Sequence, residues 1–302
     1  LYAEVFNALV SLMNRCLSSN NRTITSMLIL DTPGFQNPAS CGRQSGARFE
    51  DLCHNYLQER LQLLFHDLVF TYQQDLYAQE NIECDFEPVM SSPGPVVNLL
   101  DKASQSTLVR TTSHERNDQE EKGLFWMLDE EAIYPGSTDE TFLKRLMQMY
   151  GRSQHRKETL LKKGGLPQSF VLNHYQGTNP VLYTTKGWLR ASRENPVSRN
   201  VNAFLQESHR SEVGTLFSSI RVPGSSTLSG SIVGIEGSSS LRRASSLRRS
   251  YTTGAAGLKR KSVCLQVKYQ ADSIMDTLRR TRVHFLLCML PQNNAGLCDL
   301  RA

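Results

Sequence analysis

A short apolar run that ends in an abrupt turn constrains this chain more than any other feature. Residues 24–30 are predicted to form a short buried strand, which leads directly into Asp31-Thr32-Pro33-Gly34-Phe35-Gln36. A strand that ends in Asp and turns through Gly can present a carboxylate to a metal ion and a backbone N–H to a phosphate. The sequence therefore predicts a nucleotide site, with the neutral side chain of Gln36 at its far end.

Helical periodicity surrounds this turn. Residues 1–17 place apolar side chains on one face, and residues 49 to 80 predict a long helix of ~48 Å. Further helices are expected over residues 201–220 and 263–282, and short strands at Phe170-Val171-Leu172, at Val181-Leu182-Tyr183 and from His284 to Leu290.

A helix–loop–helix is predicted between these elements. One helix begins at Leu124, and Thr138 or Asp139 caps the next. The loop carries an apolar tip, Ile133-Tyr134-Pro135, which is either a contact surface or packed against its own domain.

Composition narrows the class of protein. The chain has 302 residues, of which 39% are hydrophobic and 21% charged, as is usual for soluble proteins. Its apolar runs are too short to span a bilayer, and its N-terminus does not resemble a signal peptide. Seven scattered Cys without a C-x-x-C pair argue against a disulfide framework and a zinc site. We expect a cytoplasmic protein with reduced thiols and without membrane insertion or a nucleic-acid partner.

Positive charge is concentrated in one Ser- and Gly-rich segment, which we predict to be a long mobile loop from Pro223 to about Gly257. Between Gly237 and Cys264 no acidic residue offsets its basic ones, which are Arg242, Arg243, Arg248, Arg249, Lys259, Arg260 and Lys261. This distribution predicts a local anionic partner. Arg242-Arg243-Ala244-Ser245 also fits a basophilic kinase substrate, with Ser245 as the acceptor.

The chain lacks the usual cradle for a nucleoside triphosphate. The pattern G-x-x-x-x-G-K-[ST] is absent, since Arg260 stands where the second Gly is needed in the nearest stretch. Two families remain open for a turn of this kind. Regulatory GTPases have D-x-x-G after a strand, but the guanine-reading N-K-x-D is also absent.

The second family is the myosins, which the chain resembles at ordered positions along nearly its whole length. Phe49-Glu50-Asp51-Leu52-Cys53-His54-Asn55-Tyr56 resembles the opening of the myosin relay helix. Further similar segments are Leu128-Asp129-Glu130-Glu131, His174-Tyr175-Gln176-Gly177, Gly187-Trp188-Leu189 and His284-Phe285 with Cys288 and Pro291. Asp31-Thr32-Pro33-Gly34-Phe35-Gln36-Asn37-Pro38, together with the Arg242–Ser245 motif, is similar to class XVIII myosins.

The resemblance implies an α/β fold that is part of a P-loop NTPase motor, with a mixed central sheet and a mostly helical actin-binding subdomain. The implied segments are 1–48 (core helix, sheet strand and switch II), 49–83 (relay helix), 84–222 (lower actin-binding subdomain), 223–262 (flexible basic loop 2) and 263–302 (helix and core strand).

The resemblance also implies roles for residues and a set of ligands. Asp31 would lie near the water shell of Mg²⁺, the Gly34 N–H near the γ-phosphate of ATP or ADP, and Phe35 against the relay helix. F-actin would meet Ile133, Tyr134, Pro135, Gly136 and the seven basic residues of loop 2. A coiled-coil tail outside this chain would supply a dimer or filament partner.

Gln36 stands where active myosins have a Glu that pairs with an Arg and helps to polarise the attacking water. Gln cannot accept a proton from water, and the loss of an acid–base partner typically costs ~10²–10⁴ in rate. Pro33 removes a backbone donor and stiffens the turn. We therefore expect an actin tether on the cytoskeleton that binds nucleotide with little or no turnover. The alternatives are an active actin-activated ATPase and, less favoured, a GTPase.

Overall fold

The fold is taken from a computed structural model, which describes residues 2–17, 25, 27–43, 45–83, 92–103, 121–151, 160–175, 180–193, 201, 204–218 and 262–287. The chain divides into two compact units. The first consists of Leu1–Asp31 and Glu194–Arg260, and the second of Thr32–Arg193 and Lys261–Ala302.

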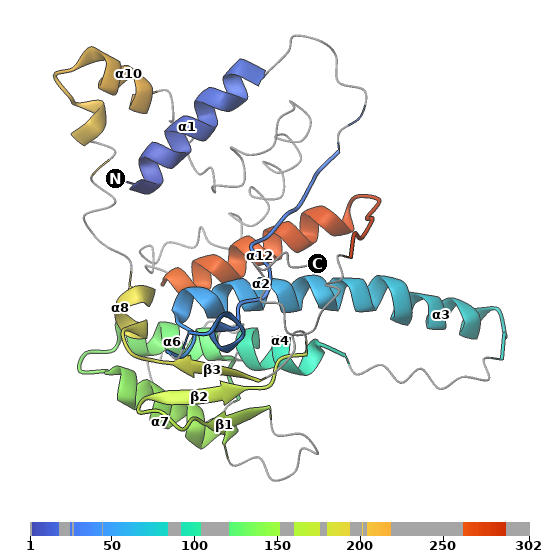
Figure 1. Ribbon diagram of the computed structural model, residues 1–302. Helices are drawn as coiled ribbons and strands as arrows, with labels where there is room; N and C mark the ends of the chain where they lie inside the picture. Colours follow the sequence, from blue (N-terminus) through green and yellow to red (C-terminus); the bar gives the residue numbers. More distant parts are fainter. Residues whose placement is uncertain are drawn as a thin grey trace, which may run out of the picture. The chain divides into compact units, whose positions relative to one another are not determined.

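The described part of the first unit includes the helices α1 (Tyr2–Leu17) and α10 (Ser211–Ser218) (Figure 1). They confirm the helix expected over residues 1–17 and part of the one expected over 201–220. The strand predicted at 24–30 is wrong over 27–30, where there is no regular structure and Met27 and Ile29 are 96% and 94% exposed. A strand needs a neighbour to pair its backbone groups, and no described strand pairs with this segment.

The predicted long helix lies in the second unit. It consists of α2 (Phe49–His66), the π-helical turn η2 (Asp67–Thr71) and α3 (Tyr72–Gln79). The first turn of α2 is closed by the Asp51 carboxylate, which accepts the Arg48 N–H at 2.8 Å. Periodicity did not indicate the π turn, where Leu68 and Val69 are already exposed, and most side chains of α3 are exposed as well.

A small antiparallel sheet lies beside these helices, with strands β1 (Leu161–Lys163), β2 (Ser169–Leu172) and β3 (Val181–Thr184) in the order β1-β2-β3. Phe170 pairs with Tyr183, which confirms the two predicted strands. The sequence missed β1 because its Lys162 and Lys163 are exposed and only its first residue is buried.

The described residues of this unit form further helices. They are α4 (Gly94–Asp101), α6 (Leu124–Ile133), α7 (Asp139–Tyr150), α8 (Trp188–Ser192) and α12 (Val263–Arg279). The helix–loop–helix and the helix from 263 are confirmed. Figure 1 shows α12 alongside α2, and α6, α7 and α8 near the sheet. No helix among these described residues is long and apolar enough to cross a membrane.

One aromatic core joins sheet and helices. Trp188 is 1% exposed, and its ring centroid lies 5.9 Å from that of Phe49, 5.6 Å from that of Phe170 and 6.2 Å from that of Tyr183. Edge-to-face pairs at these distances add to the stability from buried area. The resulting helical unit with its small sheet agrees with the predicted α/β class.

The strand predicted from His284 to Leu290 does not form over residues 284–287, and the rest of it lies outside the described residues. Leu286 is 90% exposed. As at residues 27–30, an apolar run predicts a buried strand, but no described strand pairs with this segment.

Candidate functional site

The predicted nucleotide turn has an open glycine at its centre. Gly34 has φ +83°, a conformation that favours glycine, and nothing lies within 4 Å of where a Cβ would stand. Among the described residues nothing accepts its N–H. Phe35 is 7% exposed, and its ring meets that of His174 edge-on, with the centroids 5.0 Å apart. The turn is thus anchored by Phe35 and open at Gly34.

Asn55 on α2 holds the turn through both backbone groups of Gln36. The Gln36 N–H donates to Asn55 Oδ1 at 2.6 Å, and Asn55 Nδ2 donates to the Gln36 carbonyl at 2.8 Å. Asn55 is fully buried and Gln36 is half-buried, so these bonds are partly shielded from water. Three residues further along α2, the Gln58 side chain donates to the Thr32 hydroxyl. A displacement of this turn must therefore break these bonds or move α2.

A buried polar chain continues from Asn55. Its Nδ2 lies 2.6 Å from the Tyr183 hydroxyl, which lies 2.8 Å from His174 Nε2. His174 Nδ1 is in turn 3.0 Å from Glu59 Oε1, which also accepts the Tyr175 N–H at 3.0 Å. The chain of contacts therefore leaves α2 at Asn55, crosses β3 and the segment after β2, and returns to α2 one turn later.

Burial raises the pKa of the Tyr183 phenol, opposed by its hydrogen bond with Asn55. Nearby carboxylates at Asp51 and Glu59 raise this pKa further. Tyr183 therefore stays neutral and can serve as a hydrogen-bonding link between Asn55 and His174.

The side chain of Gln36 folds back on its own turn. Its Nε2 lies 3.2 Å from the Pro33 carbonyl and 3.2 Å from the Gly34 carbonyl. A glutamate carboxylate has no hydrogen to donate there and would place negative charge beside two carbonyl oxygens. This turn conformation therefore suits Gln rather than Glu.

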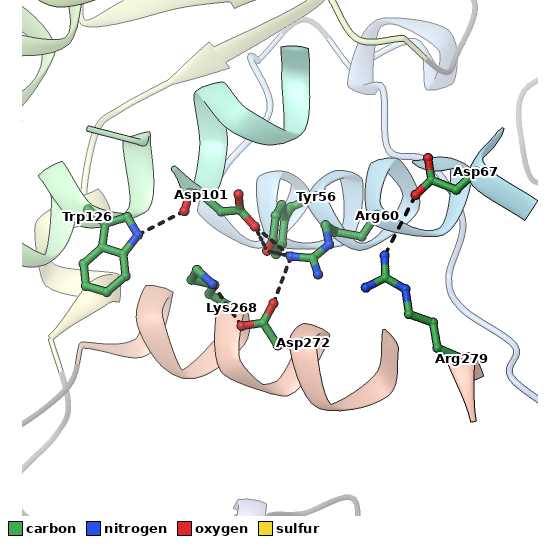
Figure 2. A network of polar contacts seen from close by, with 8 residues as sticks. All are labelled: Tyr56, Arg60, Asp67, Asp101, Trp126, Lys268, Asp272 and Arg279. Carbon is green, nitrogen blue, oxygen red and sulfur yellow. Dashed lines mark hydrogen bonds and ion pairs between the residues drawn. The ribbon is translucent and has the colours of Figure 1, made fainter. Parts of the chain in front are cut away.

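A second polar cluster fixes the middle of α2 to two other helices (Figure 2). Arg60 Nη1 lies 2.7 Å from the carboxylate of Asp101 at the end of α4 and 3.0 Å from that of Asp272 on α12. The Tyr56 hydroxyl donates to Asp101 at 2.6 Å, and Lys268 pairs with Asp272 at 2.9 Å. Burial lowers the pKa of Arg60, but Tyr56, Asp101 and Asp272 more than offset this and raise it overall.

The apolar tip lies between two helices, α6 and α7, that are joined by ion pairs. Ile133 and Tyr134 are 62% and 52% exposed. On the two helices that flank the tip, the nearly buried Arg145 of α7 pairs with Glu130 at 2.7 Å and with Glu131 at 3.3 Å, both on α6. Paired charges of this kind fix the geometry of two helices when both partners are present. The tip is therefore an exposed apolar feature beside ordered helices, which decides between the exposed and packed alternatives that the sequence left open.

Two residues that the sequence leads us to expect near a magnesium nucleotide, Asp31 and Gly34, are among the described residues. The side chain of Asp31 is exposed, and no hydrogen bond between described backbone groups uses the Gly34 N–H. No three His, Cys, Asp or Glu side chains converge on a metal site in the part of the chain that the structure describes.

Sequence reasoning found the turn and the tip but not what holds them. Asn55, His174 and Tyr183 lie within predicted motifs or strands, whereas Glu59 lies in none, although a buried Asn within an apolar stripe is a signal of its own. The basic residues of loop 2 and Ser245 lie outside the described residues.

Comparison with known proteins gives a consistent set of relatives. The family described as "Myosin head (motor domain)" matches residues 1–300. Unconventional myosin-XVIIIa of Mus musculus is 43% identical over 295 residues, which cover 96% of this chain and 14% of that protein. Unconventional myosin-XVIIIb of Homo sapiens is 34% identical over 296 residues, covering 96% and 11%. Myosin-1 of Saccharomyces cerevisiae is 27% identical over 293 residues, covering 97% and 13%. The chain thus spans no more than 14% of the length of these relatives.

Proposed function

The chain belongs to the myosin head family, in its class XVIII branch, and we propose that within a complete motor it forms a nucleotide-binding actin tether with little or no ATP turnover. The observation that carries this proposal is the Gln36 amide, whose donors face the carbonyls of its own turn. A side chain used in this way neither accepts a proton from water nor forms a charged pair with an arginine.

Nucleotide binding is supported by Asp31 and Gly34. Mg²⁺ bound with ATP or ADP would neutralise phosphate charge. The Asp31 carboxylate would bind the water shell of this ion, and the open Gly34 N–H would donate to a phosphate oxygen. Asn55 would hold the turn backbone in the same place with or without nucleotide, because its bonds to Gln36 do not involve the ligand.

Actin binding is supported by the exposed tip and by the basic segment of the sequence. Ile133, Tyr134, Pro135 and Gly136 would supply an apolar contact. The cations from Arg242 to Lys261 would meet the acidic surface of F-actin, so their contribution should weaken as salt rises. Partners held through a tail, and a place on the cytoplasmic actin cytoskeleton, belong to this proposal as well.

Cosedimentation of the complete motor with F-actin tests the tether. The proposal predicts that the motor pellets with actin whether ATP or ADP is present, and that ATP stays intact over the assay. A motor that is released by ATP and then consumes it would instead support the alternative of an active actin-activated ATPase.

Ser245 offers a further test of the basic segment. A phosphate there would add about −1.5 to −2 charges among the arginines and weaken the attraction to actin. We expect a Ser245→Glu variant to pellet less well than a Ser245→Ala variant at low salt. Equal affinity of the two variants would count against a role for this serine.

A further inference from the structure

The short helix α8 is bonded at both ends to the residues that bracket the tip loop. At its start, the Gly187 and Leu189 N–H groups donate to the two carboxylate oxygens of Asp139 at 2.7 and 3.0 Å. At its end, Arg193 Nε donates to the Ala132 carbonyl at 3.0 Å. Asp139 is the first residue of α7, and Ala132 lies in the last turn of α6. Hydrogen bonds from the two ends of α8 therefore reach the residues on both sides of the tip loop.

The helix α8 itself packs against the buried core. Trp188 and Leu189 are 1% and 5% exposed. The Trp188 ring packs against Phe142 of α7, with centroids 6.1 Å apart, and against Phe49 at the start of α2. Since α8 cannot shift without disturbing these aromatic contacts, its two end bonds fix the residues on either side of the tip.

A carboxylate at a helix N-terminus is a common cap and by itself says little. Asp139, however, caps a helix that is 48 to 50 residues away in sequence, while its own helix has a separate cap in Thr138. The bond from Arg193 to Ala132 spans 61 residues and closes the other side. Both long-range links converge on a loop whose outer residues, Ile133 and Tyr134, are exposed.

We propose that α8 acts as a strap that presets the shape of the tip, with Asp139 and Arg193 as its positioning residues. An apolar tip held in its binding conformation avoids the entropy loss of ordering a loop on contact. The strap deepens the proposed function and rests on it, because the surface that it presents would be the one that meets F-actin.

The strap is tested in the complete motor by amide hydrogen exchange and by actin cosedimentation. Asp139→Ala should speed exchange at Gly187 and Leu189 about tenfold, because each loses a charge-assisted bond. The tip amide of Tyr134, which donates to the Glu130 carbonyl at 3.0 Å, should also exchange faster. Actin affinity should fall severalfold. Glu140→Ala removes a neighbouring charge from the same turn of α7 and should change none of these quantities.

Arg193→Gln provides a second variant at an exposed position, in case Asp139→Ala impairs folding. It should speed exchange at the tip and weaken actin binding, whereas Arg190→Gln, which removes a charge from the same helix, should not. Unchanged exchange in both strap variants would overturn the strap, whatever actin does. Faster exchange with unchanged actin affinity would overturn its positioning role. A wild-type motor that fails to pellet would overturn the proposed actin contact, while the exchange rates still decide whether α8 orders the tip.

Discussion

At the scale of single residues, the turn depends on a side chain that the motif analysis did not single out. Asn55 satisfies the N–H and the carbonyl of the half-buried Gln36 and also reaches the buried Tyr183 hydroxyl. A buried group that loses its partner loses more free energy than the bond itself contributes. Position 55 should therefore tolerate substitution poorly.

We predict that Asn55→Ala lowers the free energy of unfolding by about 2–4 kcal/mol, because it leaves buried donors and acceptors without partners. Denaturant titration of the motor measures this change. Asn98→Ala, at an exposed position of α4, is the matched control and should cost less than about 0.5 kcal/mol. Equal stability of the two variants would show that the Asn55 bonds do not hold the turn.

The buried thiol of Cys264 makes the free energy of unfolding depend on pH in the alkaline range. Burial raises the pKa of its thiol from 9.0 to about 12, while its bond with Ser262 opposes the shift. Because the folded-state pKa is the higher one, the stabilisation is complete below pH 9 and is lost as the pH rises towards 12. The free energy of unfolding should fall by up to about 1.4 kcal/mol per pH unit in that window.

Denaturant titrations from pH 8 to pH 11 measure this slope. Cys264→Ser should make it shallower, whereas Cys41→Ser, at an exposed thiol, should leave it unchanged. A slope that Cys264→Ser does not alter would contradict the assignment.

At the scale of elements, α2 is the member to which the turn, α4 and α12 are all fastened. Asn55 holds the turn, and Arg60, just over one helical turn further on, holds both other helices through Asp101 and Asp272. Through these contacts a displacement of the turn would reach α4 and α12 by way of α2.

Arg60→Met should destabilise the motor by about 3–5 kcal/mol, because it leaves Asp101 and part of the Asp272 charge unpaired in a largely buried setting. Thermal or denaturant unfolding measures the loss. Arg279→Met is the control, since Arg279 is half exposed and 3.9 Å from Asp67, and it should cost less than about 1 kcal/mol. Similar losses in the two variants would contradict the view that the Arg60 cluster joins the three helices.

Elements with strong periodicity could be predicted from the sequence, and elements defined by their partners could not. The long helix from Phe49 and the strands around Phe170 and Tyr183 were predicted because their apolar patterns are unambiguous. The strands expected at 24–30 and from His284 were wrong over the described residues because an apolar run does not specify a neighbouring strand. The π turn η2 has no signature in the apolar pattern.

At the scale of the whole molecule, the order of short motifs predicted the family, and the comparisons confirmed it. The contacts that organise the candidate site could not be predicted in the same way. Asn55 and Tyr183 are 128 residues apart, and Glu59 and His174 are 115 apart. A single sequence contains no rule that pairs such distant polar residues, whereas packing α2 against β3 brings them within hydrogen-bond distance.

The tether hypothesis also belongs to this scale, because turnover is a property of the assembled motor. Its most direct test is steady-state ATP hydrolysis by the complete motor with and without F-actin, alongside a Gln36→Glu variant. We predict that the wild-type rate lies ~10²–10⁴ below that of active myosins and does not rise with actin. A wild-type rate that matches active myosins and increases with F-actin would contradict the central claim.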